Sequence, residues 1–192
     1  SSDLNVSGQC AQACSKANKM LGIINRTIQN KTQEVMVCLY KALVRPHLEY
    51  CTVAWSPSYV KDRALLERVQ HRFTRMVWGC EKIAYEDRLA KLGLWTLQER
   101  RNRADTVEVF RMFHGLSRLP FGSFFELYPS RRTRGHSLKL VKHRVRTDLR
   151  QHFFSERVVD SRNGLDEDTV VVASLFSFKR GLTRMREKKV GL

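Results

Sequence analysis

The sequence predicts a mainly α-helical protein, in which an N-terminal helical bundle over residues 1–115 precedes a small α+β or irregular, basic region over residues 116–192. Two observations support this division. Apolar residues recur at helical spacing through the first part, whereas proline, glycine and clustered aromatic residues interrupt the second. With 192 residues and 42% hydrophobic content, the chain can bury a sizeable core, as one domain or as two small ones.

The first two predicted helices are separated by a short polar turn. Small and apolar side chains recur at steps of three and four over residues 8–29, and Ser7 is placed to cap this helix. Thr32 is placed to cap the next one. That helix is expected to end or kink near Pro46, because proline lacks the backbone N–H of a helical residue.

A helix with two faces is predicted over residues 61–78 and closed by Gly79. Its apolar face carries Leu65, Leu66, Val69, Phe73, Met76 and Val77. The opposite face carries Arg68, His71, Arg72 and Arg75. One face is therefore expected to pack and the other to meet negative charge.

Two further helices complete the first part. A short one is predicted over residues 85–92, ended by Gly93, and a longer one over residues 97–114, capped by Thr96 and ended by Gly115.

Basic residues dominate the start of the second part. Residues 131–146 contain seven Lys or Arg, two His and no acid, and residues 137–140 alternate like a short strand. Farther on, residues 166–168 form an acidic turn or helix start, and Ser174 is placed to cap a last helix.

The net charge points to an anionic partner. The chain carries 35 Lys and Arg against 19 Asp and Glu, a formal net charge of +16 with a pI near 10.2. Such an excess on a globular composition indicates nucleic acid or an anionic membrane surface. No apolar run is long enough to cross a membrane, so a membrane span is excluded.

Five cysteines lie within the first 80 residues. Their odd number, without a signal peptide, predicts free thiols in a reducing compartment, so we expect an intracellular protein, nuclear or cytoplasmic, that is not secreted. Cys10 and Cys14 lack further ligands at zinc-binding spacing and are expected on a buried helix face. The first residues contain no Met, and the chain is expected to be cut from something longer.

Several stretches together carry a family resemblance, in order along nearly the whole chain. They are K-A-N-K-M-L-G-I-I (16–24), L-Y-K-A-L-V-R-P-H-L-E-Y-C (39–51), L-L-E-R-V-Q-H-R-F-T-R-M (65–76), Y-E-D-R-L-A-K-L-G-L-W-T-L-Q-E-R-R (85–101) and R-T-R-G-H-S (132–137). This succession resembles the C-terminal part of reverse transcriptases from non-LTR retrotransposons, the LINE elements of the jockey-like group.

The resemblance implies that the chain corresponds to the thumb and C-terminal extension of an RNA-directed DNA polymerase, downstream of the catalytic palm. Its partners would be RNA, DNA or an RNA–DNA hybrid, together with the upstream palm. Polymerase chemistry needs paired carboxylates that hold two Mg²⁺ ions. This chain has no Asp-Asp pair, so Mg²⁺ is expected only in the missing palm and no cofactor is expected in this fragment.

One departure from the family pattern lies at residues 162–166. Relatives usually show Trp-Asn-x-Leu-Pro there, whereas this chain has Arg162-Asn163-Gly164-Leu165-Asp166. An aromatic anchor is replaced by a charge, which is the kind of change expected in a decayed copy of the element. Lost Trp contacts in a core cost roughly 3–5 kcal/mol.

Cations on the two-faced helix and in the basic stretch are the predicted phosphate contacts: Arg68, Arg72, Arg75, Arg131, Arg132, Arg134, Lys139, Lys142, Arg144 and Arg146. For the helical arginines, the alternative is a solvated helix face. Other polar or aromatic residues are assigned structural roles. His136, His143 and His152 are predicted at the surface, the three tryptophans in the core, and the acids of residues 166–168 outside any metal site.

Three functions remain open on the sequence. The leading hypothesis is a fragment of a retrotransposon reverse transcriptase that binds template–primer through its phosphate backbone and is not catalytic alone. No G-x-S-x-G, P-loop or H-E-x-x-H motif offers an active site. A helical protein-interaction module and a genomic fossil without a stable product are the alternatives.

Overall fold

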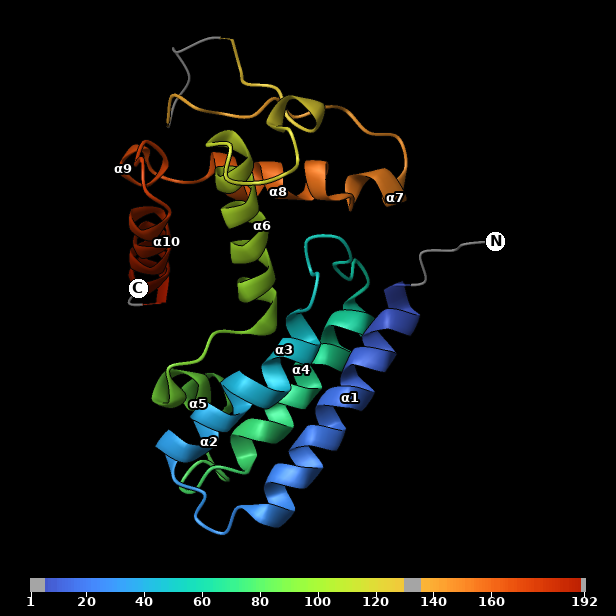
Figure 1. Cartoon of the computed structure of the whole chain (residues 1–192), viewed down its shortest axis with the longest axis vertical. Helices are drawn as coiled ribbons and strands as arrows, with labels where there is room; N and C mark the ends of the chain where they lie inside the picture. Colours follow the sequence, from blue (N-terminus) through green and yellow to red (C-terminus); the bar gives the residue numbers. More distant parts are fainter. Residues whose placement is uncertain (1–5, 130–135, 191–192) are drawn as a thin grey trace. The chain divides into compact units, whose positions relative to one another are not determined.

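Helices make up most of the structure, as the sequence predicted. The computed structural model describes residues 6–129 and 136–190. Across those two ranges, extended segments pair only at an isolated antiparallel bridge between Leu127 and Leu140 (Figure 1).

Two compact units make up the chain, residues 1–101 and residues 102–192. Their boundary lies inside α6 (Leu97–Phe113), so one continuous helix contributes to both units. The sequence placed the division after residue 115, where the composition changes. Helix α6 ends at Phe113, shortly before that position.

The first unit contains α1 (Val6–Thr27), α2 (Gln33–Leu39), the π-helix η1 (Tyr40–Val44), α3 (Arg45–Glu49), α4 (Val60–Arg75) and α5 (Tyr85–Leu92). Helices α1 and α4 lie side by side and run in the same direction (Figure 1). Ser7 on α1 donates to Asp62 on α4 at 2.6 Å, and farther along Arg72 Nη1 donates to Asn18 Oδ1 at 3.3 Å. Ser7 therefore does not cap α1, because the helix begins at Val6 and the Ser7 hydroxyl is used between helices.

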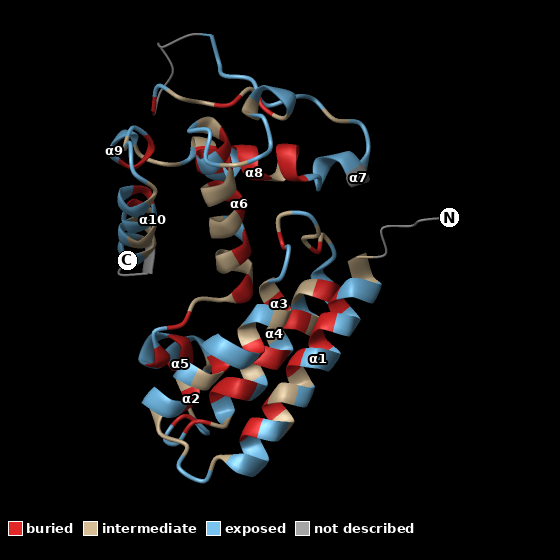
Figure 2. Cartoon of the chain, in the orientation of Figure 1, coloured by how far each residue is buried: buried red, intermediate tan, exposed pale blue. Residues whose placement is uncertain are grey.

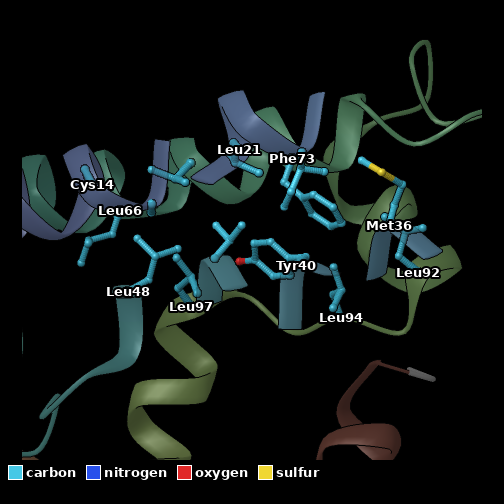
Figure 3. Packing of buried hydrophobic residues seen from close by; sticks show 14 of the residues in the cluster. Cys14, Leu21, Met36, Tyr40, Leu48, Leu66, Phe73, Leu92, Leu94 and Leu97 are labelled. Carbon is cyan, nitrogen blue, oxygen red and sulfur yellow. The ribbon is translucent and has the colours of Figure 1, made fainter. Parts of the chain in front are cut away.

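The core of the first unit lies between the apolar faces of its helices (Figure 2). Leu21 of α1, Leu66 and Phe73 of α4, and Tyr40 of η1 are fully buried, and their side chains converge in Figure 3. The rings of Tyr40 and Phe73 stack with their centroids 4.1 Å apart. The Tyr40 hydroxyl donates to Gln70 Oε1 at 2.7 Å, so this buried phenol keeps a hydrogen-bond partner. The predicted apolar face of α4 is thus confirmed.

Pro46 does not end the second predicted helix, which continues through η1 into α3. The π-helix η1 widens the backbone immediately before it, and the Arg45 N–H donates to the Tyr40 carbonyl. The next residue, Pro46, then sits in the first turn of α3, where a missing N–H costs little. A π-turn shifts the backbone register, which relieves the clash that a proline ring makes inside a regular helix.

Helix ends after α4 follow the sequence signals closely. The Glu99 N–H donates to Thr96 Oγ1 at 3.1 Å, while the Thr96 N–H donates to Glu99 Oε2 at 2.9 Å, a reciprocal capping box at the start of α6. Gly93 has φ +60° at the end of α5, a conformation that glycine adopts without strain. Earlier in the chain, the prediction for Thr32 holds only in position: Thr32 stands at the N-cap of α2, but its side chain makes no hydrogen bond to the helix.

The second unit comprises the remainder of α6, the short 3₁₀ helix η2 (Phe121–Ser123), α7 (Asp148–Gln151), α8 (Phe154–Asn163), α9 (Glu167–Val170) and α10 (Leu175–Val190). Aromatic rings form much of its core: Phe110 stacks on Phe178 at 4.4 Å, and Phe125 meets Phe154 edge to face at 5.6 Å. The strand expected over residues 137–140 is reduced to the bridge at Leu140.

Candidate nucleic-acid interface

Three predicted arginines, Arg68, Arg72 and Arg75, are exposed on α4. They lie four and three residues apart, so they share one face of the helix opposite the buried stripe. Lys61 stands one heptad before Arg68 and is also exposed, which extends the same row toward the start of the helix. The α4 face therefore presents a line of cations to solvent.

Both acids of α4 are occupied inside the unit. Asp62 is buried and accepts the hydrogen bond from Ser7. Glu67 accepts from the Tyr85 hydroxyl and, through Oε2, from the Leu97 N–H at 2.9 Å. Since both carboxylates accept hydrogen bonds inside the unit, the α4 face keeps its positive charge. Burial, followed by the hydrogen bond to Glu67, raises the pKa of Tyr85, so its phenol stays protonated as the donor of this pair.

Helix α1 extends the cationic surface next to α4. It contains no acidic residue, and Lys19 and Arg26 are exposed along it. Both residues line a shallow surface hollow with the small residues Ser15 and Gly22. Asn18 also lines it and accepts from Arg72, which joins the two helices. Sequence reasoning missed the α1 cations, although a 22-residue helix without a carboxylate was a usable signal.

A buried arginine lies beneath the end of the α4 face. Arg88 is 1% exposed, its Nη2 lies 3.2 Å from His71 Nδ1, and its guanidinium lies 5.5 Å from the Tyr85 ring centre. Burial, then the charges of Arg88 and Arg75, lowers the pKa of His71. His71 is therefore neutral at ordinary pH and contributes a ring, stacked on Tyr85 at 4.3 Å, to this face.

The basic stretch of the second unit is described only in part. Arg131, Arg132 and Arg134 lie outside the described residues. Arg144 and Arg146 are exposed, and Lys139 is half-buried. Lys142 Nζ lies 2.6 Å from Asp160 Oδ2 in an exposed ion pair, which a phosphate can replace at little cost. The predicted loop cations belong to the second unit and the α4 cations to the first.

Hydrogen bonds fasten the described start of this stretch to α8 and α9. The Ser137 N–H and hydroxyl donate to the Glu167 carboxylate at 2.7 and 2.8 Å. The Leu140 N–H donates to Asn163 Oδ1 at 2.8 Å, and Asn163 Nδ2 donates back to the Leu140 carbonyl at 2.9 Å. The cations that follow are thus presented from an anchored backbone. Glu167 has a structural role here, and Asp166 caps α9 by accepting from the Thr169 N–H at 2.8 Å.

Two predicted placements were wrong. His136, expected at the surface, is 1% exposed, because its ring donates to the Arg162 carbonyl beneath the anchored stretch. Trp78, expected in the core, is 55% exposed. Helix α4 ends at Arg75, so Trp78 falls beyond the apolar stripe that its spacing had matched. Trp55 and Trp95 are half-buried, and His143 and His152 are exposed as predicted.

All five cysteines are free, and Cys10 and Cys14 are buried on α1, as expected. Burial raises the pKa of both thiols to about 11, which keeps them protonated at ordinary pH. In the described part of the chain, no three His, Cys, Asp or Glu residues gather into a possible metal site. Nor is any helix there long and apolar enough to cross a membrane.

No protein-family model, curated protein or solved structure matches this chain.

Proposed function

We propose that this chain binds template–primer nucleic acid through its phosphate backbone, as the thumb-like and C-terminal part of a retrotransposon reverse transcriptase whose catalytic palm lies elsewhere. The ligand is an RNA–DNA hybrid or a related duplex, and this fragment performs no chemistry alone. One observation carries the proposal: the adjacent exposed faces of α1 and α4 present Lys19, Arg26, Arg68, Arg72 and Arg75, while the acids of α4 are engaged inside the unit.

Charge alone does not explain this arrangement. A protein that is basic for solubility scatters its cations and leaves carboxylates among them. On α1 there is no carboxylate, and on α4 both carboxylates hold internal hydrogen bonds. Rows of Lys and Arg on neighbouring helices can contact successive phosphates of a duplex, and they read no base. The expected binding is therefore sequence-unspecific and sensitive to salt.

The test compares two double variants that lose the same charge. R68A/R72A removes cations from the proposed face, and K41A/K82A removes exposed lysines of the same unit that lie outside it. Each lowers the formal net charge of +16 by two. We expect R68A/R72A to weaken binding to an RNA–DNA hybrid and to reduce the log–log salt slope by about 2. The lysine variant should change the slope much less.

Equal losses in the two variants would mean that only the overall charge matters and would contradict the assigned face. If no variant and no wild-type protein bound hybrid at about 50 mM salt, while all melted cooperatively, a protein-interaction module would be the better account. A third variant, R131A/R132A/R134A, tests the basic stretch in the same assay.

A further inference from the structure

A surface groove in the second unit is not used by the proposed duplex contacts. It has a volume of about 720 Å³ and is lined mainly by α10, with residues from α6 and α9. Phe176 of α10 lies in its wall and is 71% exposed. A phenylalanine so exposed in the wall of a groove offers a ring face on which a planar ligand can stack.

Cations surround this ring. The Arg180 guanidinium lies 5.8 Å from the Phe176 ring centre, one helical turn farther along α10. Lys179 and Arg184 also line the groove, with Asp168 and Glu187 as its acids. The Arg184 guanidinium approaches Asp166 only to 3.9 Å, so this exposed pair leaves the cation available to a stronger anion.

The α6 wall of the groove is held in place. Arg103 Nη1 donates to Thr183 Oγ1 at 2.8 Å and its Nη2 donates to the Lys179 carbonyl at 3.0 Å. At the α9 wall, Gly181 lies so close to Thr169 that a Cβ would come within 2.7 Å of that side chain. The groove is therefore a formed feature of the packing between α10 and its neighbours.

We propose that this groove binds single-stranded RNA or DNA, with an unpaired base stacked on Phe176 and the flanking phosphates held by Lys179, Arg180 and Arg184. Single strands are bound elsewhere by the same combination of an exposed aromatic ring and a cationic track. A duplex cannot use the ring, because its bases are stacked on each other and paired. The groove thus adds a second ligand, distinct from the hybrid duplex, and it would suit the unpaired strand that continues from a template–primer.

The test separates stacking from charge. Wild-type chain is titrated with a fluorescent ten-nucleotide oligothymidylate and with an abasic oligonucleotide of the same length and charge, at about 50 mM salt. We expect the thymidylate to bind roughly 5- to 150-fold more tightly than the abasic strand, the range of one stacked base. F176A should abolish this preference without changing the affinity for the abasic strand. F176Y should keep the preference, since it retains the ring.

Phe153 provides a matched control. It is 47% exposed and has the Arg150 guanidinium 5.4 Å from its ring centre, yet it does not line the groove. F153A should therefore leave the preference intact. Equal binding of both strands to wild-type protein, or an unchanged preference in F176A, would overturn the proposal. Binding of hybrid duplex, measured in parallel, shows whether such a failure concerns the groove alone or nucleic-acid binding as a whole.

Discussion

Arg162 is a buried cation on α8. It is 3% exposed on α8, its Nε has no hydrogen-bond partner in the described part of the chain, and its neighbour is the His136 ring. Burial lowers the pKa of its guanidinium to about 10, because the charged form loses its hydration inside the protein. The chain therefore buries this arginine at the expense of stability.

Replacing Arg162 by Met should raise the free energy of unfolding by about 1–3 kcal/mol, because an apolar side chain of similar length removes the desolvation cost. Arg157 on the same helix is the control. It donates to both carboxylate oxygens of the buried Asp105, at 2.8 and 2.9 Å, so R157M should lower the same free energy by about 3–5 kcal/mol. Chemical denaturation measures both. A destabilising R162M would contradict this account.

His136 makes the second unit sensitive to acid. Burial lowers the pKa of His136 below its ordinary 6.5, outweighing the hydrogen bond to the Arg162 carbonyl. Since a carbonyl only accepts, Nε2 carries the proton, and protonation would place a buried N–H at Nδ1, which has no partner among the described residues. The buried neutral imidazole of His136 therefore contributes fully to stability above pH 6.5, the pKa of an unfolded histidine. That stability is lost as the pH falls from 6.5 toward the lower pKa of the folded state. As the pH is lowered from 8 to 5, the melting temperature of H136Q should fall less than that of the wild-type protein. If the melting temperatures of both proteins fell in parallel, the assignment would be refuted.

At the scale of elements, two helical glycines should respond to alanine in opposite directions. A Cβ on Gly181 of α10 would lie 2.7 Å from the Thr169 side chain, whereas one on Gly22 of α1 meets nothing within 4 Å. G181A should therefore destabilise by about 1–3 kcal/mol through overpacking. G22A should stabilise by up to about 1 kcal/mol, since alanine favours a helix.

Melting temperatures of the two variants test this contrast. Adding T169A to G181A removes most of the clashing atoms and should recover part of the loss. If G181A melted like wild type, α9 and α10 would not be packed as closely as the structure places them.

For the whole molecule, binding should follow the distribution of charge. The first 96 residues carry 14 basic and 8 acidic side chains, and the remainder carries 21 and 11, so both halves are positive. With seven or more phosphates neutralised, the affinity for an RNA–DNA hybrid should fall with a log–log salt slope of about −5 or steeper. Titrations between about 50 and 200 mM salt measure it. A nearly flat slope would instead favour recognition through apolar surface.

Sequence periodicity determined the helices of this protein. Apolar residues that recur every three or four positions form one apolar stripe along a helix, and this pattern can be read from neighbouring residues alone. The apolar face of α4, the capping box at Thr96 and the turn at Gly93 all follow from neighbours within four residues. The exposure of Arg68 and Arg72 followed from the same pattern.

Tertiary structure decided which polar groups are buried and which surfaces adjoin. His136 and Arg162 meet across 26 residues, and Glu67 reaches the N–H of Leu97 across 30. Helix α1 lies beside α4, where Arg72 donates to Asn18, a pairing that no local spacing encodes. Such contacts depend on groups distant in the chain, so they are settled only when the packing of the helices brings those groups together.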